Sequence, residues 1–356
     1  MIRVGLVGYG LAGKVFHAPI IDAVEGLALA AVVERSTRNA EKIYPGITTH
    51  TSLEAMLDDP TIDAVVLATP NELHFPQAKQ VLLAGRHVIV DKPIAAASAE
   101  IAELIALSEQ QQRYLIPFHN RRWDSDFQTL LKLLHEQKLG AVVSLDSTFD
   151  RWRRKPRAGS WREEAGPSTG ILLDLGTHLV DQALVLFGPP QGVSAEVLTE
   201  REVSVINDAF TIRLRYPGHL VTLGANCLSA FPRPRYSVRG TRGGFIKWGL
   251  DPQENLLKAD PRVIETKGPH WADEPASAWG TLAIDVDDSI VTQPVKPVPS
   301  DYRLYYAAVR DAILGKAAPP VPLTDAWLVA RILEWAHESS QLRQEIPCDW
   351  STAPTN

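Results

Sequence analysis

The chain has 356 residues, of which 45% are hydrophobic and 22% charged, and its formal net charge is −6. This composition is typical of a globular enzyme, and the negative charge argues against a nucleic-acid partner. Cys227 and Cys348 lie far apart and in no metal-ligand spacing, which favours a reduced setting and no bound metal. No apolar run approaches the roughly 18 residues of a membrane helix, and the first strand begins too early for a signal peptide, so we expect a cytoplasmic protein with no membrane partner.

A glycine-rich turn follows the first apolar run. Residues 3–7 predict a buried parallel strand, and Gly8, Gly10 and Gly13 follow with the spacing G-x-G-x-x-G before a helix that runs to about residue 26. Such glycines allow a tight turn, a close approach of the backbone to a diphosphate, and close packing of helix on strand. A cation in the first helical turn is unfavourable unless an anion lies there, so Lys14 supports the same interpretation. We predict a nucleotide site formed by Gly8, Gly10, Leu11, Ala12, Gly13 and Lys14.

Glu34 follows the second apolar run, residues 27–33, roughly 20 residues after the glycines. A carboxylate there can accept hydrogen bonds from the ribose hydroxyls, which favours NAD. The next residues, Arg35 to Arg38, can instead hold the 2′-phosphate of NADP or form a solvated loop. Because a carboxylate repels that phosphate, NAD is the favoured coenzyme and NADP the alternative.

Strands and helices alternate through the first 118 residues. Further strands are expected at 64–68, 88–90 and 115–118, and helices at 53–57, 74–84 and 99–111, with Ser52 as the cap of the first of these helices and Ser98 as the cap of the third. This alternation predicts a doubly wound parallel sheet, in which ligands bind beyond the carboxyl ends of the strands. The residues at those ends are Thr69, Pro70, Asn71, Asp91, Lys92, His119, Asn120 and Arg121. His74 is either a packed, hydrogen-bonded side chain or a residue near the coenzyme.

The pattern changes at residue 119. After a helix at 125–136, period-two runs at 142–149, 193–198, 209–216, 220–227, 235–239 and 245–248 predict a large, mostly antiparallel sheet. We expect a dinucleotide-binding domain at 1–118 and an α+β domain at 119–356 that binds the substrate and makes oligomer contacts. Residues 251–300 have no clear assignment beyond an outer edge strand. The basic run 151–157 is either a loop at the pocket mouth or a solvated segment.

Asp174, His178 and Asp181 have the spacing i, i+4 and i+7, which places them on one face of a helix. A carboxylate beside an imidazole fixes its tautomer and stabilises its protonated form, so His178 can exchange a proton with a substrate hydroxyl. A purely structural Asp–His pair at a helix start is the alternative.

The chain resembles the glucose-fructose oxidoreductase/inositol dehydrogenase/MocA family in four motifs: the glycine turn, Ala68-Thr69-Pro70-Asn71-x-x-His74, Lys92-Pro93 and Asp174-x-x-x-His178. Most members have Glu where this chain has Asp91. The resemblance implies an N-terminal Rossmann domain, terminal helices at about 301–342 packed on it, and NAD(P)-dependent hydride transfer. It further implies that Lys92 relays a proton or orients the substrate, that His178 is the acid/base, and that Asp174 is its partner or a substrate contact.

Other stretches, including 16–19, 118–124, 149–152 and 249–253, resemble the scyllo-inositol dehydrogenase branch of the family. That resemblance implies a cyclic polyol or sugar substrate and a homodimer or homotetramer. Asn120, Arg121, Asp150 and Trp152 then become candidate polyol contacts, with domain-interface bonding as the alternative. Two other functions remain open: a redox-neutral sugar or glycoside-processing enzyme with tightly held coenzyme, and a non-catalytic coenzyme or sugar sensor.

Overall fold

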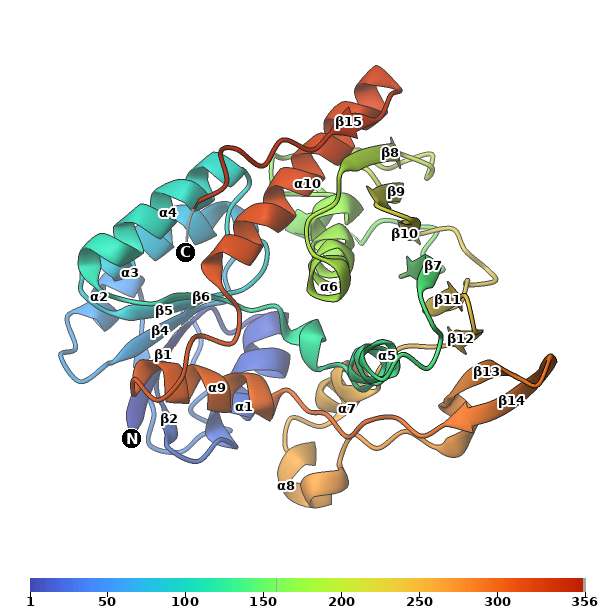
Figure 1. The fold of residues 1–356 in the computed structure, drawn as a ribbon. Coiled ribbons are helices and arrows are strands. Elements are labelled where there is room, and N and C mark those ends of the chain that lie inside the picture. The colour runs from blue at the N-terminus through green and yellow to red at the C-terminus, as the bar shows by residue number, and fades with distance from the viewer. Residues whose placement is uncertain (158, 355–356) are drawn as a thin grey trace.

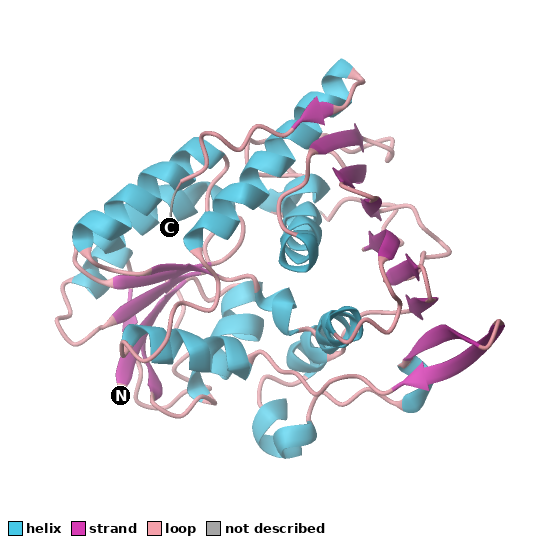
Figure 2. Ribbon diagram, in the orientation of Figure 1, coloured by secondary structure: helices cyan, strands magenta, loops and turns pink. Residues whose placement is uncertain are grey.

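The computed structural model describes residues 1–157 and 159–354, which form two sheets with helices between and around them (Figures 1 and 2). The first sheet is parallel throughout and has the strand order β3-β2-β1-β4-β5-β6. Its strands are β1 Ile2–Val7, β2 Leu27–Val33, β3 Thr48–His50, β4 Ala64–Leu67, β5 His87–Val90 and β6 Leu115–Pro117. This order is that of a dinucleotide-binding sheet, with its switch point between β1 and β4, and it confirms the predicted doubly wound architecture. The short edge strand β3 was not predicted.

The strands of the first sheet are buried on both faces, as a parallel sheet requires. All four residues of β4 are inaccessible to solvent, and alternate residues enter different cores: Val66 packs with Leu6 on one face, and Val65 packs with Val7 on the other. The helices that cover these faces are α1 Ala18–Asp22, α2 Leu53–Leu57, α3 His74–Leu83 and α4 Ser98–Gln111. A strand such as β4 is therefore a run of apolar residues without polar alternation, because both faces of the sheet are buried.

The helix after the glycine turn contains a wide π-helical turn, Gly13–His17, before α1 begins. There the N–H of Ala18 donates to the carbonyl of Gly13, five residues back. Pro19 follows directly, and a proline ring clashes with the carbonyl four residues before it in a regular α-helix. The sequence around Pro19 therefore accounts for the π-turn.

The second sheet has nine strands in the order β14-β13-β12-β11-β7-β10-β9-β8-β15. The pairing of β7 with β10 is parallel and the other pairings are antiparallel, which confirms the mostly antiparallel sheet. Its strands are β7 Val142–Thr148, β8 Gly192–Leu198, β9 Ala209–Tyr216, β10 His219–Asn226, β11 Tyr236–Gly240, β12 Gly243–Lys247, β13 Gly280–Val286, β14 Ser289–Val295 and β15 Ile346–Pro347. Helices α5 Ser125–His135 and α6 Thr177–Phe187 lie on the face turned toward the first sheet (Figure 1).

The segment without a sequence assignment is mostly structured. It contains the short helices α7 Gln253–Ala259 and α8 Val263–Lys267, and the hairpin of β13 and β14. β14 is the edge strand of the second sheet, as expected for this segment, whereas the hairpin and the helices were missed.

Two C-terminal helices connect the halves of the molecule. α9 Arg303–Ile313 contacts α1, and α10 Leu323–Leu342 contacts α4, α6 and β8 (Figure 1). The sequence prediction that Ser98 caps α4 was wrong: Ala97 holds the N-cap position, and the backbone N–H and hydroxyl of Ser98 donate to Glu334 of α10 at 2.7 and 2.8 Å. A carboxylate from another helix therefore satisfies the start of α4. Over the described residues, no helix is long and apolar enough to cross a membrane.

Candidate active site

A groove of about 590 Å³ runs over the carboxyl ends of the first sheet and is lined by the glycine turn. Gly8 has a φ of +97°, and a Cβ on it would lie 2.7 Å from the carbonyl oxygen of Ala68. A Cβ on Gly13 would lie 2.1 Å from the carbonyl oxygen of Gly8, so helix and strand pack closely there. A Cβ on Gly10 would meet nothing within 4 Å. The open space belongs to the glycine that should face a diphosphate, and the turn therefore fits a dinucleotide.

Leu11 and Ala12 also line the groove, whereas Lys14 does not. The Lys14 ammonium lies 5.4 Å from the centroid of the Tyr9 ring and is exposed to solvent. A cation–π contact with Tyr9 thus accounts for its position without a bound anion.

Glu34 lies at the end of the groove but is already engaged by its own loop. Its carboxylate accepts hydrogen bonds from the Thr37 hydroxyl at 2.6 Å and from the Ala40 backbone N–H at 2.9 Å. Arg35 is exposed and lines the same end of the groove. The Glu34 carboxylate, which would repel a 2′-phosphate, and the Arg35 guanidinium, which would attract one, therefore lie at the same end of the groove.

The motif after β4 is divided between the groove and the core. Thr69, Pro70 and Asn71 line the groove, and the Asn71 amide donates to the carbonyl of Ser168 from the second half of the chain. His74 is 1% exposed and is absent from the groove lining; its ring nitrogens lie 2.7 Å from the carbonyl of Pro93 and 2.9 Å from that of Thr69. The structure therefore favours the packed role for His74, which braces two strand-end segments rather than contacting a coenzyme.

A second cavity, of about 130 Å³, adjoins the groove where the two halves meet, and Leu11, Ala12 and Asp91 line both. Lys92 enters it from the end of β5, and its ammonium donates to the Asp174 carboxylate at 2.9 Å and to the Asp174 carbonyl at 2.6 Å. Arg151 lies 3.6 Å from the other carboxylate oxygen. Burial alone would raise the pKa of the Asp174 carboxyl, but the charges of Lys92 and Arg151 outweigh it and hold that pKa well below its usual value.

Asp91, which replaces the usual glutamate of the resembled family, is not the partner of the Lys92 ammonium. One oxygen of the Asp91 carboxylate accepts from the Lys92 backbone N–H at 2.7 Å, and the other lies 3.8 Å from the ring of His17. The shorter side chain thus fixes the backbone of the strand end, and Asp174 holds the ammonium.

His178 lines the same cavity without touching Asp174 through a hydrogen bond among the described residues. A second π-helical turn, Leu172–Gly176, contains Asp174, but Asp174 and His178 still line the same cavity, as their spacing predicts. Asp181 does not line it, because Arg122 binds both oxygens of its carboxylate, so that part of the expected common face was wrong. Burial lowers the pKa of His178 well below its usual value, and the positive charge of Lys92 lowers it further. The imidazole is therefore neutral near pH 7.

Two of the four candidate polyol contacts, Asn120 and Arg121, line this cavity. The structure does not bring the other two to it. Arg233 binds both oxygens of the Asp150 carboxylate, at 2.7 and 2.8 Å, and Trp152 is 59% exposed. Sequence reasoning missed the lining residues Phe16, Glu254 and Lys258, and treated Arg153 and Arg157 only as part of a basic run. The run does lie at the mouth of the cavity, so of the two alternatives for it the pocket-mouth loop is the one observed.

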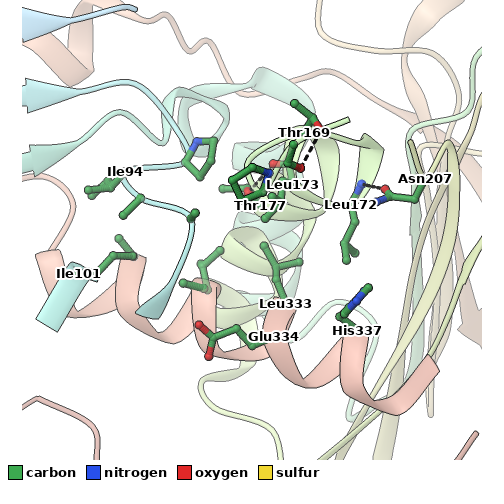
Figure 3. Close-up of a pocket in the computed structure, with 18 of the residues that line it drawn as sticks. Ile94, Ile101, Thr169, Leu172, Leu173, Thr177, Asn207, Leu333, Glu334 and His337 are labelled. Atoms are coloured by element: carbon green, nitrogen blue, oxygen red, sulfur yellow. Dashed lines mark hydrogen bonds between the residues drawn. The ribbon is translucent and has the colours of Figure 1, made fainter. Parts of the chain in front are cut away.

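A third cavity, of about 430 Å³, lies behind this site and is lined mostly by aliphatic side chains (Figure 3). Ile94 and Ile101 face Leu172 and Leu173 across it, and Leu333 of α10 closes one side. Lys92, Asp174 and His178 are absent from the lining of this third cavity, so it is not the candidate centre for proton transfer.

The chain matches two family descriptions in succession. Residues 2–119 match the oxidoreductase family with an NAD-binding Rossmann fold, and residues 127–246 match the GFO/IDH/MocA C-terminal domain. Together these segments cover more than half of the chain, and the chain therefore belongs to the Gfo/Idh/MocA family of NAD(P)-binding oxidoreductases.

Individual relatives support the same assignment over nearly the full length. The chain is 40% identical to the uncharacterized oxidoreductase YdgJ of Escherichia coli, covering 96% of this chain and 97% of the relative. It is 33% identical to the scyllo-inositol 2-dehydrogenase (NADP(+)) IolW of Bacillus subtilis, covering 97% and 95%. The solved structure of a Bacillus subtilis protein described as an oxidoreductase, yvaA, superimposes with a TM-score of 0.94 at 33% identity, over 98% of both chains.

Proposed function

We propose that the protein is an NAD(P)-dependent dehydrogenase or reductase acting on a CH–OH group of a cyclic polyol or sugar. One observation carries the proposal: the groove with the glycine turn continues into a cavity lined by Lys92, Asp174 and His178. A nicotinamide coenzyme, when bound, supplies the hydride acceptor or donor. The chain itself must bind the substrate, orient one hydroxyl and manage one proton.

The two proton-handling groups have different tasks. Lys92 is held in place by Asp174, so its ammonium can donate a hydrogen bond to the reacting substrate oxygen with little reorganisation. His178 is neutral, so its imidazole can accept the hydroxyl proton when the alcohol is oxidised and return it when the ketone is reduced. Hydride and proton then leave the same alcohol to different acceptors, which balances the reaction.

The substrate class is supported by similarity and by the lining of the cavity. IolW is named for scyllo-inositol, and the polar side chains Asn120 and Arg121 line the cavity together with the aromatic ring of Phe16. Several hydrogen-bonding groups around an apolar surface suit a ring that carries hydroxyls.

For the coenzyme we propose NAD, because the Glu34 carboxylate would repel a 2′-phosphate. Glu34→Gln removes the charge and keeps one oxygen to accept the Ala40 N–H, so the loop should persist. The ratio of kcat/KM with NADP to that with NAD should rise about tenfold, which corresponds to about 1.4 kcal/mol. An unchanged ratio would show that Glu34 does not select the coenzyme.

The direct test is a spectrophotometric screen of inositols, sugars and sugar acids with NAD and NADP in parallel. We expect net formation of reduced coenzyme with at least one of them, and its loss in the Lys92→Ala variant. If the coenzyme stays bound through gel filtration and is never reduced by any of these compounds, the proposal fails.

We also propose that the protein works in the cytoplasm as a homodimer or homotetramer. Cys227 and Cys348 are free thiols, and the second sheet turns one face away from the helices α5 and α6 (Figure 1). Exposed apolar side chains on its strands include Val143, Leu220 and Ile290 of β14. Light scattering should give two or four chain masses, and a monomer would overturn this part of the proposal.

A further inference from the structure

The cavity next to the glycine groove has an excess of positive charge. Among the described residues, seven arginine and lysine side chains line it but only three carboxylates do. A cavity meant for a neutral polyol has no need of such an excess, because buried or half-buried cations without partners are costly. The cations that have no carboxylate partner therefore indicate the charge of the ligand that the cavity binds.

Four of the cations have carboxylate partners in the cavity. Lys92 and Arg151 share Asp174, and Arg121 and Lys258 share Glu254. The third carboxylate, Asp91, lies beside His17 and accepts a backbone N–H, so its charge is also engaged.

Arg153 and Arg157 are different. Over the residues that the structure describes, neither guanidinium has an ion pair or a side-chain hydrogen bond, although Arg153 is half-buried. The seventh cation, Arg162, also has no ion pair there, but its guanidinium lies over the Trp161 ring, 4.4 Å from the centroid. Burial is the main cause that lowers the pKa of Arg153, and the positive charges of Arg151 and Arg157 lower it further. A bound anion would relieve this repulsion.

The backbone around Arg153 is extended and hydrogen-bonded to residues 226–228, and this places the Arg153 side chain in the cavity. The N–H groups of Arg151 and Arg153 donate to the carbonyls of Asn226 and Cys227 at 2.9 and 2.7 Å, and Trp152 forms a β-bridge with Leu228. Successive side chains of an extended segment point to opposite sides. Arg151 and Arg153 therefore face the cavity, while Trp152 and Arg154 face solvent.

We propose that the substrate carries a carboxylate or phosphate group, bound by Arg153 and Arg157, in addition to the hydroxyl presented to Lys92 and His178. This inference rests on the proposed function, which it narrows from neutral polyols to acidic or phosphorylated ones. Arginine presents a planar fork of donors that suits either anion. The anion is assigned to the substrate because Arg153 and Arg157 are absent from the lining of the glycine groove, whereas Arg162 lines both spaces.

Matched ligand pairs test the proposal through binding as well as turnover. Titration calorimetry in the presence of coenzyme would compare glucose with glucuronate and glucose 6-phosphate, and myo-inositol with its monophosphates. We expect at least one anionic ligand to bind about tenfold or more tightly than its neutral counterpart, with the preference shrinking as salt screens the charges. The carboxylate and phosphate arms show which anion is preferred.

Arg153→Gln and Arg157→Gln should each weaken that anion about tenfold while the affinity for NAD or NADP is retained. Arg154→Gln, from the solvent side of the same segment, is the matched control and should bind like the wild type. The inference is overturned if no anionic ligand binds more tightly than its neutral counterpart, or if Arg153→Gln weakens the coenzyme instead.

The same measurements separate this inference from the proposed function. Turnover of a neutral polyol that requires Lys92, with no anionic counterpart binding or turning over better, would leave the dehydrogenase proposal intact and overturn the anion site. Binding of an anion through Arg153 without any hydride transfer would overturn the dehydrogenase proposal and leave the anion site intact.

Discussion

Two clusters of charged side chains, each with a histidine, meet at neighbouring turns of one helical segment, which contributes Asp174 and His178 to one cluster and Asp181 to the other. The open cluster, Lys92, Asp174 and His178, lines the cavity beside the glycine groove. The closed cluster comprises Arg122, Asp181, Asp325 and His119. There Arg122 binds both oxygens of the Asp181 carboxylate at 2.9 and 2.6 Å and Asp325 at 2.7 Å, and His119 lies 3.8 Å from Asp181.

The two clusters contain the same kinds of side chain but differ in their exposure to solvent and to the cavity beside the glycine groove. Asp181 is 1% exposed and its cluster ties α6 to α10, whereas the Asp174 side chain is 34% exposed and its partner Lys92 faces the cavity. Access to the cavity beside the glycine groove, rather than the residue types or their spacing, therefore distinguishes the candidate catalytic cluster from the structural one, whose His119 lines only the aliphatic cavity. Substitutions in each cluster test this distinction.

The largest expected change is a loss of kcat when residues of the open cluster are substituted. Lys92→Met and His178→Phe should each reduce kcat about a hundredfold or more, because each removes a group that exchanges or orients the hydroxyl proton. Coenzyme affinity, measured by fluorescence titration, should be retained. Near-normal turnover in either variant would remove that residue from the mechanism.

In the closed cluster, the effect should appear in stability instead. Arg122→Met leaves the buried Asp181 carboxylate without its partner, and breaking a buried pair of this kind costs about 3–5 kcal/mol. Denaturant unfolding should show the loss, while the folded variant keeps a kcat close to that of the wild type. A large fall in kcat with unchanged stability would mean that the two clusters are not distinct in role.

The pH dependence of the open cluster provides a smaller effect with a definite sign. Oxidation needs a neutral His178, and its pKa is lowered from 6.5 by burial and by nearby positive charges. The acid limb of kcat/KM should therefore lie below pH 6.5, and activity should fall as the pH drops through it. Because Lys92→Met removes one of those positive charges, the limb should move to higher pH in the residual activity of that variant.

The smallest effect is expected for His119, which has the same ring as His178 but belongs to the closed cluster. His119→Phe fills a similar volume and removes two buried ring nitrogens that have no hydrogen-bond partner among the described residues. We expect kcat/KM to change by less than about threefold, or about 0.7 kcal/mol. A loss like that of His178→Phe would mean that the cavity alone does not identify the working histidine.

Much of this arrangement was predictable from local sequence signals. The glycine spacing predicted the turn and the groove, and Lys92 was predicted at a strand end because apolar runs mark where strands stop. The basic run 151–157 was recognised, but its alternation between cavity and solvent depends on a β-bridge to Leu228, which no local pattern reveals. The pairing of Lys92 with Asp174 joins residues 82 positions apart and was likewise invisible.

Local sequence patterns specify most of the strands and helices outside residues 251–300, the glycine turn and the identity of the residues at the strand ends, since each depends on a few neighbouring side chains. Only the tertiary structure decided which charges are partners. The packing of the two halves brings Lys92 to Asp174 and encloses Asp181 with Arg122. Electrostatic partnership depends on distance in space and on access to water, and both are set by how the two sheets and their helices pack.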